Sequence, residues 1–228
     1  MADIFDEVEE ELRSDRAKIF WDKYGNFVIA AAVFIVLGTA GNTGWHYYSE
    51  TLRLERADKY AIAMEAVSAG KIEDATKSFD ALVADGGTGY GIIGRFQLAK
   101  IKADNADKAA AVTLYKAIND DTGVEDIYRD LALLFIVMNT MDSGDKATLE
   151  SQISQLTGDD APWKLLALEQ SAALALRDGD KAKAIEIFQR LADDVESPSG
   201  LRARSSETLK ALGQYPLGQS FDQKSDCV

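Results

Sequence analysis

Hydrophobic and polar positions divide the chain into one uninterrupted apolar segment and a long stretch with helical periodicity. The apolar segment, residues 27–45, reads F-V-I-A-A-A-V-F-I-V-L-G-T-A-G-N-T-G-W and holds no charged residue. A helix of that length rises about 28 Å, which is close to the thickness of a bilayer's hydrocarbon core. Downstream of Tyr48, apolar residues recur at helical spacing almost throughout, and the whole chain has only three prolines. The pattern therefore predicts an all-α protein.

Aromatic residues flank the apolar segment on both sides, as they do at the two interfaces of a membrane. The flanking residues are Trp21, Tyr24, Trp45, Tyr47 and Tyr48. They favour a single transmembrane helix over residues 26–46. A buried core helix over residues 27–37 is one alternative, and a signal peptide cleaved near residues 38–40 is another. Because eight acidic and four basic residues precede the apolar segment, which is unlike the basic start of a signal peptide, we expect an uncleaved signal anchor.

The residues before the span predict a helix of their own. Apolar positions recur near helical spacing over residues 3–20, so residues 1–25 are interpreted as an amphipathic cytoplasmic tail. Four Lys or Arg residues precede the span and three follow it closely, which favours a cytoplasmic N-terminus. Gly38, Gly41 and Gly44 form a small-residue surface where another span could make a helix contact, as in a homo-oligomer.

The part after the span carries a repeat of 36 or 37 residues. In each unit a small residue is followed by an aromatic residue four positions later and an aliphatic residue three positions after that. The three regular units carry Ala75, Phe79 and Leu82, then Ala111, Tyr115 and Ile118, and then Ala184, Phe188 and Leu191. Small residues also stand one helix earlier, at Ala63, Ala99 and Ala172.

A third unit, aligned on Ala147, Ser151 and Ser154, departs from this pattern and has Phe135 at the earlier small position. It is either a divergent repeat or a helix pair in a different register. Each unit would be two antiparallel helices that bury their apolar faces only by stacking. We therefore expect an α-solenoid of about four degenerate helix pairs over residues 47–214. A capping helix near residues 200–212 ends it, and residues 215–228 form a flexible tail.

Charge and composition argue against most chemistry. A net charge of −13 argues against nucleic acid as a partner, because phosphate binding needs clustered Lys and Arg. The single Cys227 and the single His46 leave no intramolecular disulfide, cysteine-cluster metal site or ordinary catalytic triad. The glycine-rich residues 86–91 lack a phosphate-loop Lys and are interpreted as a flexible turn between repeats.

Three Asp pairs, at 120–121, 159–160 and 193–194, fall at predicted helix ends, where Asp commonly caps or is solvated. We therefore predict no catalytic residue, no cofactor and no metal, and thus no enzyme. The surface expected to act is the concave groove formed by the first helices of the units. Projecting the repeat places Tyr60, Met64, Phe96, Lys100, Arg129, Glu169 and Arg177 along it.

Residues 177–188, R-D-G-D-K-A-K-A-I-E-I-F, resemble a tetratricopeptide repeat, whose second helix carries a small and then an aromatic residue at this separation. The whole chain resembles the YfgM-type single-span proteins of Gram-negative bacteria, which are ancillary to the SecYEG translocon. This resemblance rests on M-A-D-I-F-D-E-V, F-W-D-K-Y-G-N and G-W-H-Y-Y, followed by degenerate repeats. It implies an inner-membrane protein with a periplasmic repeat domain that associates with the translocon and a membrane-anchored periplasmic chaperone.

Two functions are compatible with these features. The first is a non-enzymatic, membrane-anchored protein-interaction module that handles exported polypeptides as a translocon subunit or chaperone adaptor. The second is a structural scaffold that oligomerises in the inner membrane for an envelope complex. A groove lined by recognition residues favours the first, and contact through the glycine surface of the span favours the second.

Overall fold

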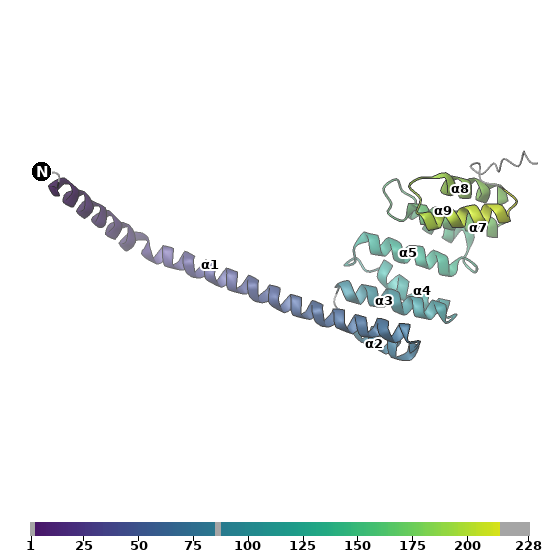
Figure 1. Ribbon diagram of the computed structural model, residues 1–228, viewed down its shortest axis with the longest axis horizontal. Helices are drawn as coiled ribbons and strands as arrows, with labels where there is room; N and C mark the ends of the chain where they lie inside the picture. The colour runs from purple at the N-terminus through teal and green to yellow at the C-terminus, as the bar shows by residue number, and fades with distance from the viewer. Residues whose placement is uncertain (1–2, 85–87, 215–228) are drawn as a thin grey trace, which may run out of the picture. The chain divides into compact units, whose positions relative to one another are not determined.

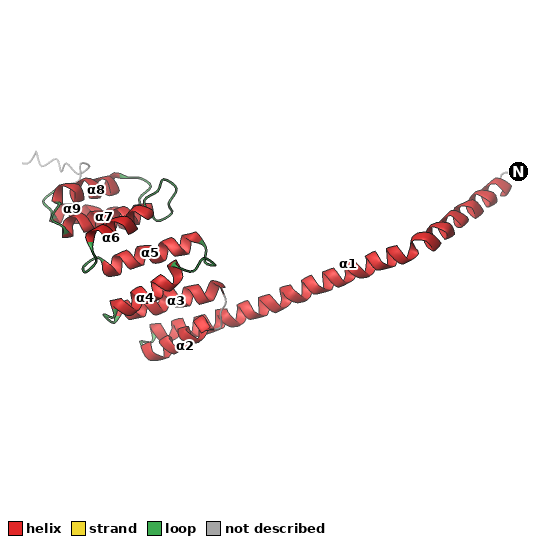
Figure 2. Ribbon diagram, turned by 180° about the vertical axis from the view of Figure 1, so that it is seen from behind, coloured by secondary structure: helices red, strands yellow, loops and turns green. Residues whose placement is uncertain are grey.

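The computed structural model describes the backbone of residues 3–84 and 88–214, and their side chains except at residues 3–20, 28 and 88. Every regular element in these ranges is an α-helix, so the all-α prediction is confirmed (Figure 1, Figure 2). The helices are α1 (Asp3–Ser68), α2 (Ile72–Ala84), α3 (Thr88–Asp104), α4 (Lys108–Asn119), α5 (Asp126–Thr140), α6 (Lys146–Gln155), α7 (Lys164–Arg177), α8 (Lys181–Asp193) and α9 (Ser199–Ala211). The predicted tail over residues 215–228, with Cys227, lies outside the described residues.

The chain forms two compact units, Met1–Asp58 and Lys59–Val228. The first unit is the N-terminal part of α1, which continues unbroken through the predicted tail and the predicted span. Large apolar side chains of the span are exposed, including Phe27 at 78% and Phe34 at 80%. By length and composition this helix is able to cross a membrane. An uncovered apolar surface of this kind is unfavourable in water, so it calls for an apolar surrounding.

The second unit is a stack of helix pairs. The end of α1 pairs with α2, followed by α3 with α4, α5 with α6 and α7 with α8, and α9 closes the stack against α8. Among the described residues, each pair has its own cluster of buried apolar side chains, and each cluster also takes in the helix that follows the pair. No pair therefore completes its core alone, as expected of a solenoid.

The repeat positions of the three regular units lie where the sequence predicts. The first residue of each triplet, Ala75, Ala111 or Ala184, has no exposed surface. The residues four and seven positions later are buried as well. The earlier small residues Ala63, Ala99 and Ala172 are also completely buried. Small side chains at both positions allow the two helices of a pair to pack closely together.

Three of the pairs share one turn between their helices. A residue with left-handed backbone closes the first helix, and it is Gly70, Ala106 or Gly179, with φ of 71°, 62° and 84°. The amide of the next residue then donates to the carbonyl five positions back, for example from Asp180 to Ala175 at 2.8 Å. Only three residues, such as 178–180 between α7 and α8, separate the helices in this turn.

An Asp side chain caps the second helix in the later pairs. Asp107 accepts a hydrogen bond from the amide of Ala110, and Asp180 from that of Lys183, both at 3.1 Å. The small core residue, Ala111 or Ala184, stands four positions after the cap. The position of the capping Asp therefore determines which residue of the second helix is buried first in the core.

The third pair has a longer turn and a different register. Five residues, 141–145, separate α5 from α6, in place of three. Asp145 caps α6 by accepting from the amide of Thr148 at 3.1 Å, and four positions later Leu149 is 1% exposed. The predicted core positions Ala147, Ser151 and Ser154 are exposed, so that alignment is wrong by two residues. Of the two explanations open from the sequence, a helix pair in a different register is the correct one.

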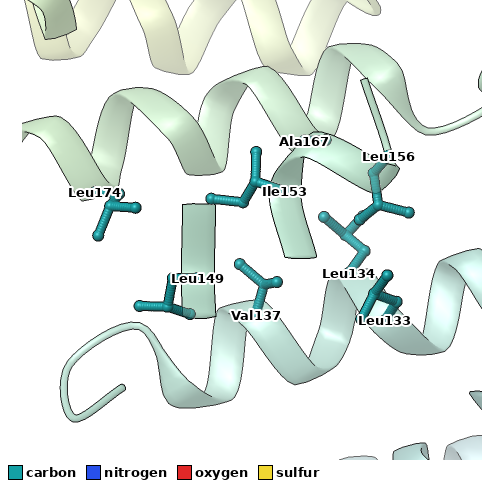
Figure 3. Packing of buried hydrophobic residues seen from close by; sticks show 8 residues of the cluster. All are labelled: Leu133, Leu134, Val137, Leu149, Ile153, Leu156, Ala167 and Leu174. Carbon is teal, nitrogen blue, oxygen red and sulfur yellow. The ribbon is translucent and has the colours of Figure 1, made fainter. Parts of the chain in front are cut away.

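The corrected register restores the spacing of the other pairs. Leu149, Ile153 and Leu156 are buried at the same intervals as Ala75, Phe79 and Leu82. Val137 lies twelve positions before Leu149, as Ala63 does before Ala75, and it is completely buried. Figure 3 shows Val137 from α5 close to Leu149 and Ile153. Larger aliphatic side chains therefore fill this pair, where the other pairs have Ala.

The register leads to a stability prediction for the third pair. Leu149→Ala should lower the free energy of unfolding by about 2–5 kcal/mol, because it leaves a cavity in a closed cluster. Ser151→Ala, at a position that the 36-residue alignment placed in the core, should change it by less than about 0.5 kcal/mol. Urea unfolding of the full chain in detergent, followed by circular dichroism, measures both. A larger effect at Ser151 would contradict the corrected register.

Candidate protein-binding groove

A groove lies between α3 and α5, the first helices of the second and third pairs, with α4 packed against both. Its volume is about 500 Å³, which is within the usual range for ligand pockets. The residues that line it are Ile93, Phe96, Gln97, Lys100, Ala103 and Asp104 of α3, Tyr115 of α4, and Tyr128, Leu131, Phe135 and Asn139 of α5. Two first helices of adjacent pairs therefore form its walls, on the side where the sequence predicts the binding surface.

Three aromatic rings from three different helices form the floor of the groove. Tyr115 stacks on Phe135, with ring centroids 5.1 Å apart and an angle of 22° between the planes. The ring centroid of Phe96 lies 5.9 Å from that of Tyr115 and 6.0 Å from that of Phe135, and the rings of Phe96 and Phe135 are arranged edge to face. Rings locked against one another in this way keep their positions, so an incoming apolar side chain meets a preformed surface.

Phe135 distinguishes this groove from equivalent positions in the other pairs. In the corrected register it stands two residues before Val137, where the other pairs have Ala61, Gln97 and Gln170. The sequence marked Phe135 as an exception to the small-residue rule, and in the structure it belongs to the groove, while Val137 takes the core position. The aromatic floor is thus a local feature of the second and third pairs.

At the C-terminal ends of α3 and α5, the polar side chains along the edge of the groove carry no net charge. Lys100 pairs with Asp104 one turn further along α3 at 2.5 Å. The side-chain amide of Asn139 donates to the carbonyl of Phe135 at 2.8 Å. Burial raises the pKa of Tyr115 to about 12, and the charge of Asp104 adds to the shift. Its hydroxyl therefore stays protonated at physiological pH and offers a neutral hydrogen-bonding group at the floor.

Of the residues predicted for binding, Phe96 and Lys100 line this groove. Tyr60 and Met64 are half-buried against the core of the first pair. The hydroxyl of Tyr60 accepts a hydrogen bond at 3.2 Å from Gln97, which does line the groove. Arg129 pairs with Asp126 on its own helix and is not among the lining residues. Binding roles for Tyr60, Met64 and Arg129 stay predictions.

The two remaining predicted residues make contacts between repeats. Glu169 of α7 accepts two hydrogen bonds from the guanidinium of Arg204 of α9, both at 2.9 Å. This pair raises the pKa of Arg204, chiefly through the hydrogen bond. Arg177 donates to the carbonyls of Met141 and Gly144, at 2.8 and 2.9 Å, and so fixes the turn between α5 and α6. The first contact joins α7 to the closing helix α9, and the second joins α7 to the turn of the preceding pair.

Several groove residues escaped the sequence-based prediction. Tyr128, Leu131 and Phe135 lie at helical spacing on one side of α5 and line the groove together. Their spacing of three and four residues was the available signal. It was hidden because the core of α5 was aligned two residues out of place, and because nearly every residue of L-A-L-L-F-I-V-M is apolar.

The glycine surface of the span is open. A methyl group added at Gly38, Gly41 or Gly44 would meet no atom within 4 Å beyond its chain neighbours and the adjacent backbone of its own helix. Their role in helix contact stays a prediction. The glycine-rich segment was interpreted as a turn, but α3 begins at Thr88, so Gly89 and Gly91 are helical and that interpretation is wrong for them. Residues 86 and 87 lie outside the described part of the chain.

The Asp pairs have structural contacts at helix ends. Asp121 accepts from the amide of Gly123 at 2.9 Å, and Asp194 from that of Glu196 at 2.8 Å. Asp159 pairs with Lys164 at 3.3 Å. Within the described ranges no three His, Cys, Asp or Glu side chains gather where a metal ion could be held. These contacts lie in the connections that follow α4, α6 and α8, where the sequence predicts capping or solvated Asp residues, and they stabilise turns in place of capping helices.

The contacts of Arg177 predict a structural effect separate from binding. Arg177→Met should lower the free energy of unfolding by about 1–3 kcal/mol, because two carbonyls of the α5–α6 turn lose a charged donor. Arg190→Met, at an exposed position of α8, should change it by less than about 0.5 kcal/mol. Chemical unfolding of the full chain in detergent compares the two. An equal effect of both variants would contradict the proposed fixing of the turn.

The helical repeat fold agrees with a known sequence family. The profile of the tetratricopeptide repeat-like domain matches residues 18–203, which is most of the chain. No curated protein matches the chain. Tetratricopeptide-like repeats are solenoids that generally mediate protein–protein interaction through an extended concave surface. By its helix pairs and by this match, the chain belongs to the tetratricopeptide repeat-like domain family.

Proposed function

We propose that the chain is a non-enzymatic, membrane-anchored protein-interaction module whose α3–α5 groove binds exported polypeptides beside the translocon. The observation that carries the proposal is the aromatic floor formed by Phe96, Tyr115 and Phe135 in an open groove of a repeat domain. Preformed apolar grooves with a polar rim suit extended segments of other chains. The translocon and a periplasmic chaperone are the partners that the resemblance to YfgM-type proteins supports.

The proposed place is the bacterial inner membrane, with the N-terminus in the cytoplasm and the repeat domain in the periplasm. The exposed apolar surface of α1 supports an anchor. The aromatic residues at both ends of the span and the slight excess of Lys and Arg before it support this orientation.

Photo-crosslinking from the groove in intact cells tests the proposal. A photoreactive phenylalanine analogue at Tyr128, which is 40% exposed, should form adducts with translocon or chaperone subunits or with chains in export. The same analogue at Val195, 86% exposed in the α8–α9 turn, should not, because it lies outside the groove. Immunoblotting against those subunits measures the adducts. Only self-products at Tyr128, or the same adducts at both positions, would contradict a role of the groove.

The orientation is checked in the same cells. Protease added to intact spheroplasts should digest the repeat domain while leaving a fragment that contains the span. Protection of the repeat domain would place it in the cytoplasm, and handling of exported chains by the periplasmic groove would then be excluded.

A scaffold that oligomerises through its span is the second candidate, and the open glycine surface favours it. Gly41→Ile together with Gly44→Ile should then abolish self-association, because bulky side chains keep two helices apart. No atom of the chain itself would clash with the new side chains near their attachment points. Detergent-resistant oligomers measured by chemical crosslinking report the effect. Unchanged oligomers in the double variant would remove this candidate.

A further inference from the structure

The two ends of the α3–α5 groove differ in charge. Ile93 and Tyr128 line it near the N-terminal ends of the two walls, and Asp104 and Asn139 near the C-terminal ends. The segment that enters α5, residues 120–130, holds five acidic residues and one basic residue. The acidic residues are Asp120, Asp121, Glu125, Asp126 and Asp130. None of them lines the groove, but the segment that leads to Tyr128 carries a surplus of negative charge close to this end of it.

Nearby cations compensate only part of this charge. Arg129 pairs with Asp126, and Arg95 of α3 approaches Asp121 at 3.8 Å. Two cations against five carboxylates leave a local excess of three negative charges. Asp130 follows the groove residue Tyr128 by two positions on α5 and, like Arg129, is not among the lining residues. The excess negative charge of this segment would attract a cation that a ligand brings to this end of the groove.

The titration of Asp130 agrees with this description. Its pKa is raised, first by burial and then by the charge of Asp126, while Arg129 acts in the opposite direction. The C-terminal end of the groove differs, because Lys100 pairs with Asp104 and the nearby Lys108 pairs with Asp142 at 2.9 Å. The groove is therefore apolar at its centre and neutral at one end, and an acidic segment lies beside the other end.

Resting on the proposed function, we infer that this groove selects extended peptide segments that carry an aromatic or large aliphatic side chain next to a Lys or Arg. The apolar side chain lies on the floor of Phe96, Tyr115 and Phe135, and the cation lies at the acidic end beside Tyr128. From Ile93 to Asp104 the α3 wall rises about 17 Å, which corresponds to about five residues of extended chain. Apolar and basic residues therefore need to lie within a few positions of each other.

Binding of short labelled peptides to the full chain in detergent tests the inference by fluorescence anisotropy. Three peptides of equal length carry Leu-Phe with a nearby Lys, Leu-Phe with Glu in its place, or Lys without Leu-Phe. The first should bind about three- to tenfold more tightly than the second at low salt. This preference should largely disappear at about 0.5 M NaCl, because the acidic end is exposed to solvent. The third peptide should bind most weakly.

Paired variants assign the preference to the acidic end. Glu125→Gln with Asp130→Asn should remove most of the preference for Lys over Glu and leave the circular dichroism spectrum unchanged. Glu73→Gln with Asp74→Asn is the matched control, because these exposed acidic residues occupy the first turn of α2, away from the groove. The control should keep the preference. Loss of the preference in both double variants would overturn the assignment.

The outcomes separate this inference from the proposed function. Equal binding of the Lys and Glu peptides, weakened by Tyr128→Ser, would overturn selection by charge and leave binding in the groove standing. Absence of binding by every peptide would overturn the inference, and the crosslinks from Tyr128 would then decide the proposed function independently. Tighter binding of the Lys peptide that depends on both Tyr128 and the acidic pair would support the inference.

Discussion

The four-residue step from the start of a second helix to its first core residue is the constraint on which the repeat domain depends. The left-handed residue ends one helix, and the next helix begins at a fixed distance from it. Ala111, Leu149 and Ala184 all stand four positions after a capping Asp. Since side chains at that position meet the preceding helix, the turn decides which residues of the second helix are buried. Core composition is therefore free to vary, provided that this distance is kept.

The third pair shows where the solenoid tolerates a change in repeat length. The core moves from Ala147 to Leu149 because two more residues separate Ile118 from Val137 than separate Leu82 from Ala99, while the twelve-residue step from Val137 to Leu149 equals that of the other pairs. Arg177 holds the longer turn by donating to the carbonyls of Met141 and Gly144, so a contact from the next pair replaces the short hydrogen-bonded closure. The spacing within each pair is thus kept by capping and packing, and the length of the repeat follows from the connection to the next pair.

Much of the fold follows from residue spacing, and less of the groove does. The spacing of small, aromatic and aliphatic residues predicted which side chains are buried around Ala75, Ala111 and Ala184. Each of these side chains has a single role, either to allow close helix packing or to fill the core. The third pair could not be aligned by residue type, because Leu149 and Val137 replace the Ala that marked the other units. The capping Asp145 was the better signal. Of the residues predicted to line a binding groove, those outside the second pair do not line the observed groove. Glu169 and Arg177, for example, contact other repeats, and the spacing within one repeat does not specify such contacts.

The groove exists because α5 is apolar on more sides than a surface helix needs. One side, with Ala132 and Ile136, completes the core of the second pair, and another, with Leu134 and Val137, forms the core of the third. The side with Tyr128, Leu131 and Phe135 is left to line the groove. A helix buried on two sides has its position fixed, so its remaining apolar side is presented rigidly and cannot collapse onto the core. The acidic residues at the start of α5 would add selectivity to this surface. An apolar floor attracts many peptide segments, and charge distinguishes among them.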